Sequence, residues 1–227
     1  MKKQGKIILT LGVLLMASAL VYSLMLIRTD NQAGEASRAA LNEISAAMHG
    51  AEVELADENV PLAALPDGET VELPDEETPL AAVPLNPNRE MTVVEVKGKN
   101  YIGVLEIPDL GLELPVADEW DEAVAKTAPC RYSGTAYKGG FVIAAHNYKS
   151  LFGSIKRLEE GARITFTDMD GLELTYEVAK KEVLDATAID EMVCADWDLT
   201  LFTCNFDGSA RYTVRCSAAD QDSTSTS

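Results

Sequence analysis

The stretch Thr200-Leu-Phe-Thr-Cys204-Asn-Phe-Asp-Gly-Ser-Ala-Arg211-Tyr-Thr-Val-Arg215-Cys216 decides how this chain folds. Its two halves are rich in residue types that favour strands, and Asp207-Gly208 between them is a strong signal for a two-residue hairpin turn. A turn closed at that dipeptide sets Cys204 directly opposite Arg211. Opposed side chains in such a pair have Cβ atoms roughly 5 Å apart. The pattern therefore predicts a thiol beside a permanent cation, and such surroundings favour the reactive thiolate.

A reactive cysteine needs a partner for proton transfer, and the chain contains only two histidines. His49 lies in a polar, helix-forming stretch close to the hydrophobic N-terminal segment. His146 follows the apolar run 141–145, which predicts a buried strand with a histidine at its exit. A cysteine, a histidine and an arginine, each at a strand end, are suited to acyl transfer through a thioester.

These residues resemble the sortases, the cysteine transpeptidases of Gram-positive cell surfaces. The family's Thr-Leu-x-Thr-Cys signature is present at 200–204, an arginine follows early in the next strand, and the family's strand-terminal histidine matches His146. The resemblance covers roughly residues 100–216, and 102–108 is similar to the family's first strand. One departure is Ala145, where many relatives have glycine before the histidine.

The sequence predicts a mainly β domain with short helices at 118–126 and 151–158. Eight short strands separated by turn signals suggest a closed barrel, and the resemblance implies the eight-stranded barrel of the sortases. The expected strands are 101–107, 112–116, 131–137, 141–145, 163–167, 172–180, 199–204 and 211–216.

The N-terminal run 7–27 carries no charge and is long enough to cross a bilayer as a helix. Three lysines precede it, so the positive-inside rule predicts a cytoplasmic N-terminus and places everything after Arg28 outside the cell membrane. A cleaved signal peptide is the alternative, because 17–19 has the small-x-small form of a cleavage site. The apolar run continues for eight residues beyond that site, which favours an uncleaved anchor.

Composition divides the chain into an anchor (1–29), an acidic, proline-rich extracellular linker (30–90), a catalytic domain (91–217) and a disordered tail (218–227). A short helix is expected at 35–48, with Leu41, Ile44 and Met48 on one face and Gly50 at its end. It is interpreted as a spacer, with a partner-binding helix as the alternative. Residues 65–69 and 73–77 faintly resemble the Leu-Pro-x-Thr-Gly sorting signals that sortases cut. A linker that shields the active site as a pseudosubstrate is therefore an alternative.

The net charge of −18 argues against nucleic acid as a partner. The resemblance implies instead that Cys204 attacks a Leu-Pro-x-Thr-Gly-like signal of a secreted protein, that His146 protonates the leaving amine and that Arg211 stabilises the oxyanion. The amine that resolves the thioester would come from a peptidoglycan precursor or a pilin. The connection 181–198 is then expected to help form the substrate groove. The candidate substrate-binding residues are Thr203, Ile189 and Met192.

Two other functions remain open, an inactive membrane-anchored binding module with a sortase-like barrel and a cysteine peptidase that ends in hydrolysis. No cofactor or metal is expected, because the cysteines lack zinc-site spacing and the acidic residues of 181–198 lack the regular spacing of a calcium loop, although some sortases bind calcium near this region. Three cysteines are interpreted as structural, and a Cys130–Cys194 or Cys194–Cys216 bridge is left open.

Overall fold

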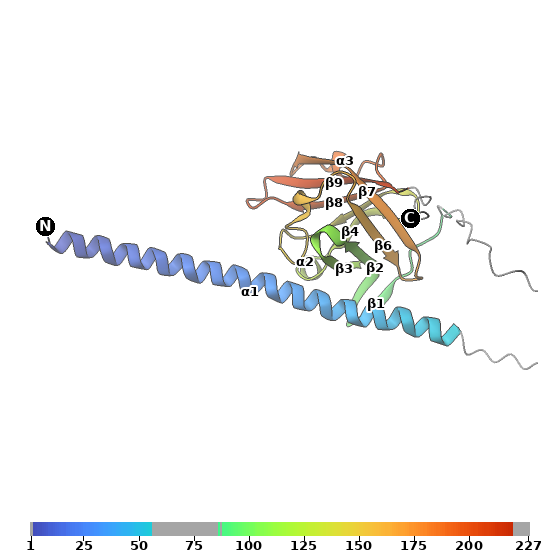
Figure 1. Cartoon of the computed structure of the whole chain (residues 1–227), viewed down its shortest axis with the longest axis horizontal. Helices are drawn as coiled ribbons and strands as arrows, with labels where there is room; N and C mark the ends of the chain where they lie inside the picture. The colour runs from blue at the N-terminus through green and yellow to red at the C-terminus, as the bar shows by residue number, and fades with distance from the viewer. Residues whose placement is uncertain (1, 56–85, 87, 220–227) are drawn as a thin grey trace, which may run out of the picture.

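The computed structural model describes residues 2–55, 86 and 88–219, with the side chains of 2–10 and 49–55 left out of the description. Figure 1 shows a β-barrel lying against one long helix, α1 (Lys2–Leu55), whose N-terminal half projects away from the barrel. Most of the proposed linker and tail, with the two segments that resemble sorting signals, lies outside the described residues.

Nine strands form one sheet in the order β1-β2-β3-β4-β5-β8-β9-β7-β6, and pairing of β2 with β6 closes eight of them into a barrel. The predicted eight-stranded barrel is confirmed. The strands are β1 (Val94–Val96), β2 (Lys99–Ile107), β3 (Leu112–Ala117), β4 (Cys130–Thr135), β5 (Gly139–Ala144), β6 (Arg163–Asp168), β7 (Glu173–Asp185), β8 (Leu199–Cys204) and β9 (Ala210–Ala218). The short helices are η1 (Pro108–Leu110), α2 (Glu122–Ala125), η2 (Ile155–Arg157) and α3 (Ile189–Met192).

The barrel interior is filled by the residues that face inward along each strand. Phe141 of β5 and Phe166 of β6 meet edge to face with ring centroids 5.1 Å apart, and neither ring is exposed. Leu151, Phe152 and Ile155, from the segment after His146, complete the same core with no exposed surface. The segment next to the histidine is therefore held by apolar packing.

The β8–β9 hairpin has the predicted register, because Cys204 pairs with Arg211 and Thr200 with Arg215. The expected two-residue turn is wrong: the loop has four residues, 206–209, and is closed by a bond from the Asn205 N–H to the Ala210 carbonyl. Side-chain bonds favour the wider loop, since Asp207 accepts from the N–H and the hydroxyl of Ser209. The four-residue loop is centred on the same dipeptide, so the register is unchanged.

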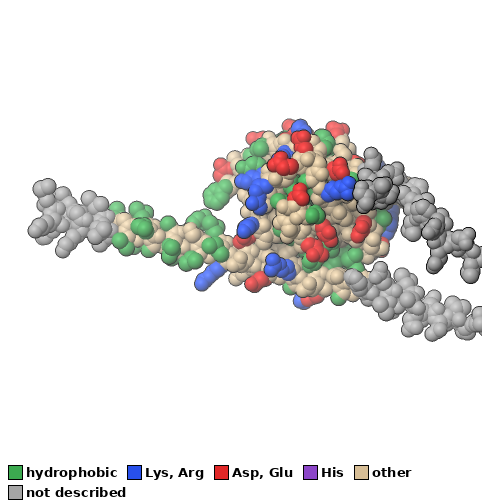
Figure 2. Space-filling model, viewed as in Figure 1, with side chains coloured by type: hydrophobic (Ala, Val, Ile, Leu, Met, Phe, Trp, Pro, Cys, Tyr) green, Lys and Arg blue, Asp and Glu red, His purple; other side chains and the backbone are tan. Residues whose placement is uncertain are grey.

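Helix α1 is continuous, whereas the sequence predicted an anchor followed by a separate helix that ended at Gly50. Gly34 and Gly50 both lie inside the helix, because a single glycine costs only about 1 kcal/mol in a helix and the flanking residues are strong helix formers. Among the described helices only α1 is long and apolar enough to cross a membrane. The apolar side chains from Leu11 to Ile27 are exposed and cover the visible face of the projecting segment in Figure 2.

Beyond the apolar run, one face of α1 packs on the barrel. Ala33, Ser37 and Ile44 are 3%, 2% and 0% exposed, a spacing that places them on one side of the helix. Ile44 joins an apolar cluster with Tyr101 and Val104 of β2, while Glu43 pairs with Lys97 in the β1–β2 turn. The helix predicted as a spacer therefore docks on the catalytic domain of its own chain.

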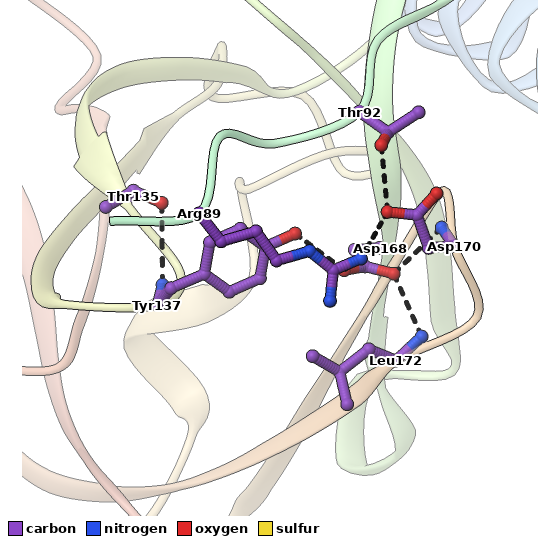
Figure 3. Close-up of polar contacts among 7 residues, drawn as sticks. All are labelled: Arg89, Thr92, Thr135, Tyr137, Asp168, Asp170 and Leu172. Atoms are coloured by element: carbon purple, nitrogen blue, oxygen red, sulfur yellow. Dashed lines mark hydrogen bonds and ion pairs between the residues drawn. The ribbon is translucent and has the colours of Figure 1, made fainter. Parts of the chain in front are cut away.

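A polar cluster joins the chain before β1 to the barrel (Figure 3). It lies near the start of β5, at the opposite end of the barrel from Ala144. The buried Asp168 carboxylate accepts from the Tyr137 hydroxyl at 2.6 Å and from the N–H groups of Asp170 and Leu172, each at 2.9 Å. Arg89 binds Asp170, lies 3.6 Å from the Asp168 carboxylate and covers the Tyr137 ring. Residues 88–92 thus belong with the barrel, slightly before the expected start of the domain at residue 91.

We expect Ile44→Ala to weaken the docking of α1 by about 2–4 kcal/mol, because it removes a fully buried side chain and leaves a cavity against β2. Thermal unfolding of the full chain in detergent micelles should show a transition several degrees lower. Asn42→Ala, on the exposed face of the same helix, is the matched control and should leave the transition unchanged. Equal transitions for the two variants would mean that α1 does not stabilise the barrel.

Candidate active site

Parallel pairing of β5 with β8 brings His146 and Cys204 to the same edge of the barrel. The register pairs Ala144 with Phe202, and both strands run in the same direction, so the residues two positions further on lie side by side. Two bonds extend the pairing past β5: the Ala145 N–H donates to the Phe202 carbonyl, and the Thr203 hydroxyl donates to the Ala145 carbonyl at 2.7 Å. The strand ends are therefore fixed up to the two candidate residues.

Arg211 approaches Cys204 from the other side, directly across the β8–β9 ladder. One terminal nitrogen of its guanidinium donates to the carbonyls of Gly208 at 3.0 Å and Ala210 at 3.2 Å. These bonds hold the group over the hairpin loop. Arg211 and Cys204 are both partly exposed, so a substrate can reach them. The predicted cysteine, histidine and arginine thus come together at one edge of the barrel, with Cys204 and Arg211 on β8 and β9 and His146 two residues beyond the end of β5.

The His146 ring stands among aromatic neighbours and one carboxylate. Trp120 meets it edge to face at 5.9 Å between ring centroids, and Tyr148 lies at 5.4 Å. The Nε2 atom is 3.6 Å from a carboxylate oxygen of Glu122, too far for a hydrogen bond but close enough for attraction when the imidazole is protonated. Sequence reasoning missed Trp120 and Glu122, because the β3–β4 connection that carries them has no motif.

Arg215, four residues after Arg211, is only 1% exposed and has a structural role. Its guanidinium donates to Glu182 of β7 at 2.8 Å and to the Thr200 hydroxyl at 3.0 Å. It also donates to the carbonyls of Glu191 and Met192 in the connection between β7 and β8. Burial opposes ionisation of Glu182, but hydrogen bonds from Lys180 and Arg215 keep its pKa below the ordinary value. Arg215 therefore anchors the connection expected to form the substrate groove.

The candidate substrate-binding residues occupy three different environments. The Thr203 side chain is 2% exposed and is used in the bond to Ala145. Met192 is also 2% exposed and packs against a small apolar cluster that includes Phe202. Ile189 is 51% exposed and is the member of the set best placed to meet a ligand from solvent.

Two acidic residues that flank the connection 181–198 are paired within the protein. Hydrogen bonds from the side chain and N–H of Thr187, with a smaller attraction from Arg211, lower the pKa of Asp185. Asp198 accepts from the Ala218 N–H at 2.7 Å. Within the described part of the chain no three His, Cys, Asp or Glu residues are grouped so that they could hold a metal ion. The Asp185 and Asp198 carboxylates therefore stabilise the local backbone through these hydrogen bonds.

All four cysteines lie in the described part of the chain and are free, so neither bridge left open by the sequence is present. Cys130 and Cys216 are fully buried. Burial raises the pKa of Cys130 to about 11 and that of Cys216 to about 12. Both therefore remain neutral thiols near neutral pH and are closed to solvent, whereas Cys204 is partly exposed.

We expect iodoacetamide at pH 8 to modify Cys204 in the native chain and to leave Cys130 and Cys216 untouched. The reacting species is the thiolate, and burial denies these two residues both ionisation and access. Peptide mass spectrometry of the native and the denatured protein gives the readout, with complete labelling after denaturation as the control. Rapid native labelling of Cys216 would contradict the packing of β9.

Comparison with known proteins identifies the family. Residues 105–219 match the Sortase domain family. Sortase A of Bacillus anthracis is 30% identical over 135 residues, a match that covers 55% of this chain and 63% of the relative, so the chain spans less than two thirds of the relative's length.

Two solved structures complete the comparison. Sortase A from Corynebacterium diphtheriae superposes with a TM-score of 0.51 at 24% identity, over 56% of this chain and 64% of that one, and it shows the shared fold. A sortase C of Clostridium perfringens, solved with the C-terminal cell wall sorting motif, reaches 0.47 at 26% identity over 53% of this chain and 71% of that one. The family match covers half of the sequence and includes the edge of the barrel built by β5, β8 and β9. The chain belongs to the sortase family.

Proposed function

We propose that this sortase is a transpeptidase that cuts a Leu-Pro-x-Thr-Gly-like signal and transfers the acyl group to an amine. The observation that supports it is the register of three strands, which gathers Cys204, His146 and Arg211 at one edge of the barrel. The exposed apolar helix α1 supports a membrane anchor, with the N-terminus in the cytoplasm and the barrel outside.

In the first half-reaction the Cys204 thiolate attacks the threonine carbonyl carbon of the signal. The carbonyl electrons move onto oxygen, and the tetrahedral intermediate collapses with cleavage of the threonine–glycine bond. The imidazolium of His146 gives its proton to the departing glycine amine. The products are a thioester on Cys204, a released C-terminal peptide and a neutral His146.

In the second half-reaction an amine attacks the thioester carbonyl. His146 now accepts the proton of the amine, an amide bond forms and the Cys204 thiolate leaves. In both halves negative charge develops on the same oxygen, and a fixed cation helps most where charge forms in the transition state. The partly exposed guanidinium of Arg211, which lies across the ladder from Cys204, is proposed to stabilise that oxygen.

The alternatives differ from the proposal in the fate of the acyl group. A peptidase would pass it to water, and an inactive module would not form the thioester. The intact set of three residues supports an enzyme over a binding module. Incubation of the purified protein with a sorting peptide and a glycine-based amine separates the three, because transfer product, hydrolysis product and no product are distinct masses. The proposal requires transfer product in excess over hydrolysis product.

We expect Cys204→Ala to abolish turnover, since no other described cysteine lies at this edge of the barrel. The unaltered protein should form a peptide adduct on Cys204 that hydroxylamine releases, as a thioester requires. His146→Ala should be equally inactive for lack of the proton donor. His49→Ala, in α1, and Cys194→Ala are the matched controls and should keep the activity. An adduct on another cysteine would overturn the assignment.

Arg211→Ala should lose at least about a hundredfold in turnover, the scale observed when one oxyanion-stabilising donor is removed. Arg215→Ala should lose less than about tenfold in kcat, because its buried guanidinium contacts the protein scaffold. Arg211→Lys should restore only part of the rate, since an ammonium lacks the planar fork of donors.

Steady-state kinetics and thermal unfolding of the same preparations separate the two roles. Arg215→Ala leaves Glu182 without its buried partner, so its unfolding transition should fall, whereas that of Arg211→Ala should stay close to the parent value. A collapsed rate for Arg215→Ala together with a normal rate for Arg211→Ala would exchange the two assignments.

A further inference from the structure

Helix α1 lies along the barrel, and its N-terminal part is the part nearest the catalytic end. Near residue 43 it meets the β1–β2 turn through the Glu43–Lys97 pair. Nearer its N-terminus it meets the segment after β5, because Asp30 accepts hydrogen bonds from the backbone and the hydroxyl of Ser150 at 2.9 and 2.8 Å. Ser150 lies only four residues after His146. In Figure 1 the ends of β8 and β9 that meet at the hairpin loop point the same way as the projecting half of α1.

The contact at Asp30 lies very close to the end of the apolar run. Ile27 is the last residue of that run, and a helix rises about 1.5 Å per residue, so Asp30 is only about 4.5 Å further along the axis. Arg28, between them, is a natural headgroup neighbour. If the run spans the bilayer, the segment 147–150 is held at the level of the lipid headgroups.

The same end of the barrel carries an exposed aromatic residue. Phe206 is 86% exposed, the most exposed large apolar side chain of the described residues. It lies in the hairpin loop two residues after Cys204, and bonds from Ser209 to Asp207 and between the Asn205 and Ser209 side chains hold that loop in one shape. A rigid loop that presents an aromatic tip is suited to entering a lipid interface.

We propose that the catalytic end of the barrel rests on the membrane surface, with Phe206 inserted at the boundary between the lipid headgroups and the acyl chains. The proposal rests on the proposed spanning role of α1 and adds a second, independent contact with the lipid. Lys149, exposed beside Ser150, provides a positive charge at the same level for lipid phosphates.

The continuity of α1 favours the lipid surface over another occupant of this end. The helix continues without a break from the apolar run into the docked segment, where Ala33 and Ile44 are buried, so no hinge separates the membrane from the barrel. The orientation of the barrel is therefore set by the helix. A second copy or a partner protein would have to fit between this end and the bilayer.

The test uses the full chain in phosphatidylcholine vesicles and measures quenching of tryptophan fluorescence by lipids brominated on their acyl chains. The probe protein carries Phe206→Trp together with Trp120→Phe and Trp197→Phe. The matched control carries only Trp120→Phe and keeps Trp197, whose carbonyl accepts from Gly140 at the start of β5, the end away from the catalytic residues. An interfacial aromatic sits roughly 5–10 Å deep, so we expect about twofold loss of fluorescence for the probe and little for the control.

A second variant tests whether α1 sets the depth. Seven alanines inserted between Thr29 and Asp30 add about two helical turns, which moves the barrel about 10 Å from the bilayer and keeps nearly the same face of α1 toward it. Quenching of the probe should then disappear. The proposal is overturned if brominated lipid leaves the original probe unquenched, if quenching survives the insertion, or if the chain recovered from vesicles lacks residues 1–29.

The measurement is independent of turnover. Adding Cys204→Ala to the probe protein should leave quenching unchanged, so a failure of the proposed transpeptidation and a failure of membrane contact give different results. A blue-shifted but unquenched probe would show that protein, and not lipid, covers Phe206, and this outcome would also overturn the proposal.

Discussion

The candidate site depends on one constraint, the parallel pairing of β5 with β8. Parallel neighbours cannot be joined by a tight turn, so the two strands come from segments almost 60 residues apart and meet only in the assembled sheet. The hydrogen bond from Thr203 to the Ala145 carbonyl lies one residue before both Cys204 and His146. A buried bond of this kind is strong because water cannot compete for either partner. The positions of the thiol and the imidazole are therefore a consequence of this long-range pairing of β5 with β8.

Strand β9 carries two arginines, Arg211 and Arg215, and the extent of their burial distinguishes them. Their spacing puts both on one face of the strand, so side-chain direction alone cannot distinguish them. Arg215 is buried and joins β7, β8 and two carbonyls of the long connection between them. Arg211 lies near the exposed end of the ladder, beside Cys204. The buried guanidinium of Arg215 stabilises the scaffold, whereas Arg211 stays partly exposed, as the role proposed for it requires.

Much of the barrel could be predicted because its strands are short, alternating and separated by turn signals. The β8–β9 register followed from the centre of symmetry at Asp207-Gly208, and it was unaffected by the true length of the loop. The loop length could not be predicted, since it depends on side-chain bonds of Asn205 and Asp207 that compete with a tighter turn. Strand β1 was missed because three residues give too little periodicity to recognise.

The docking of α1 on the barrel could not be predicted from the sequence. The sequence does place Leu41, Ile44 and Met48 on one face of a helix, but this spacing does not show which surface the apolar face packs against. The partner surface, with Tyr101 and Val104, belongs to β2, which is paired with both β3 and β6 and so depends on segments far away in the sequence. Because the apolar face of α1 is buried against this surface, the helix is held in a fixed position on the barrel. If α1 spans the bilayer as proposed, the number of residues between the apolar run and Asp30 sets the distance from the bilayer to Cys204.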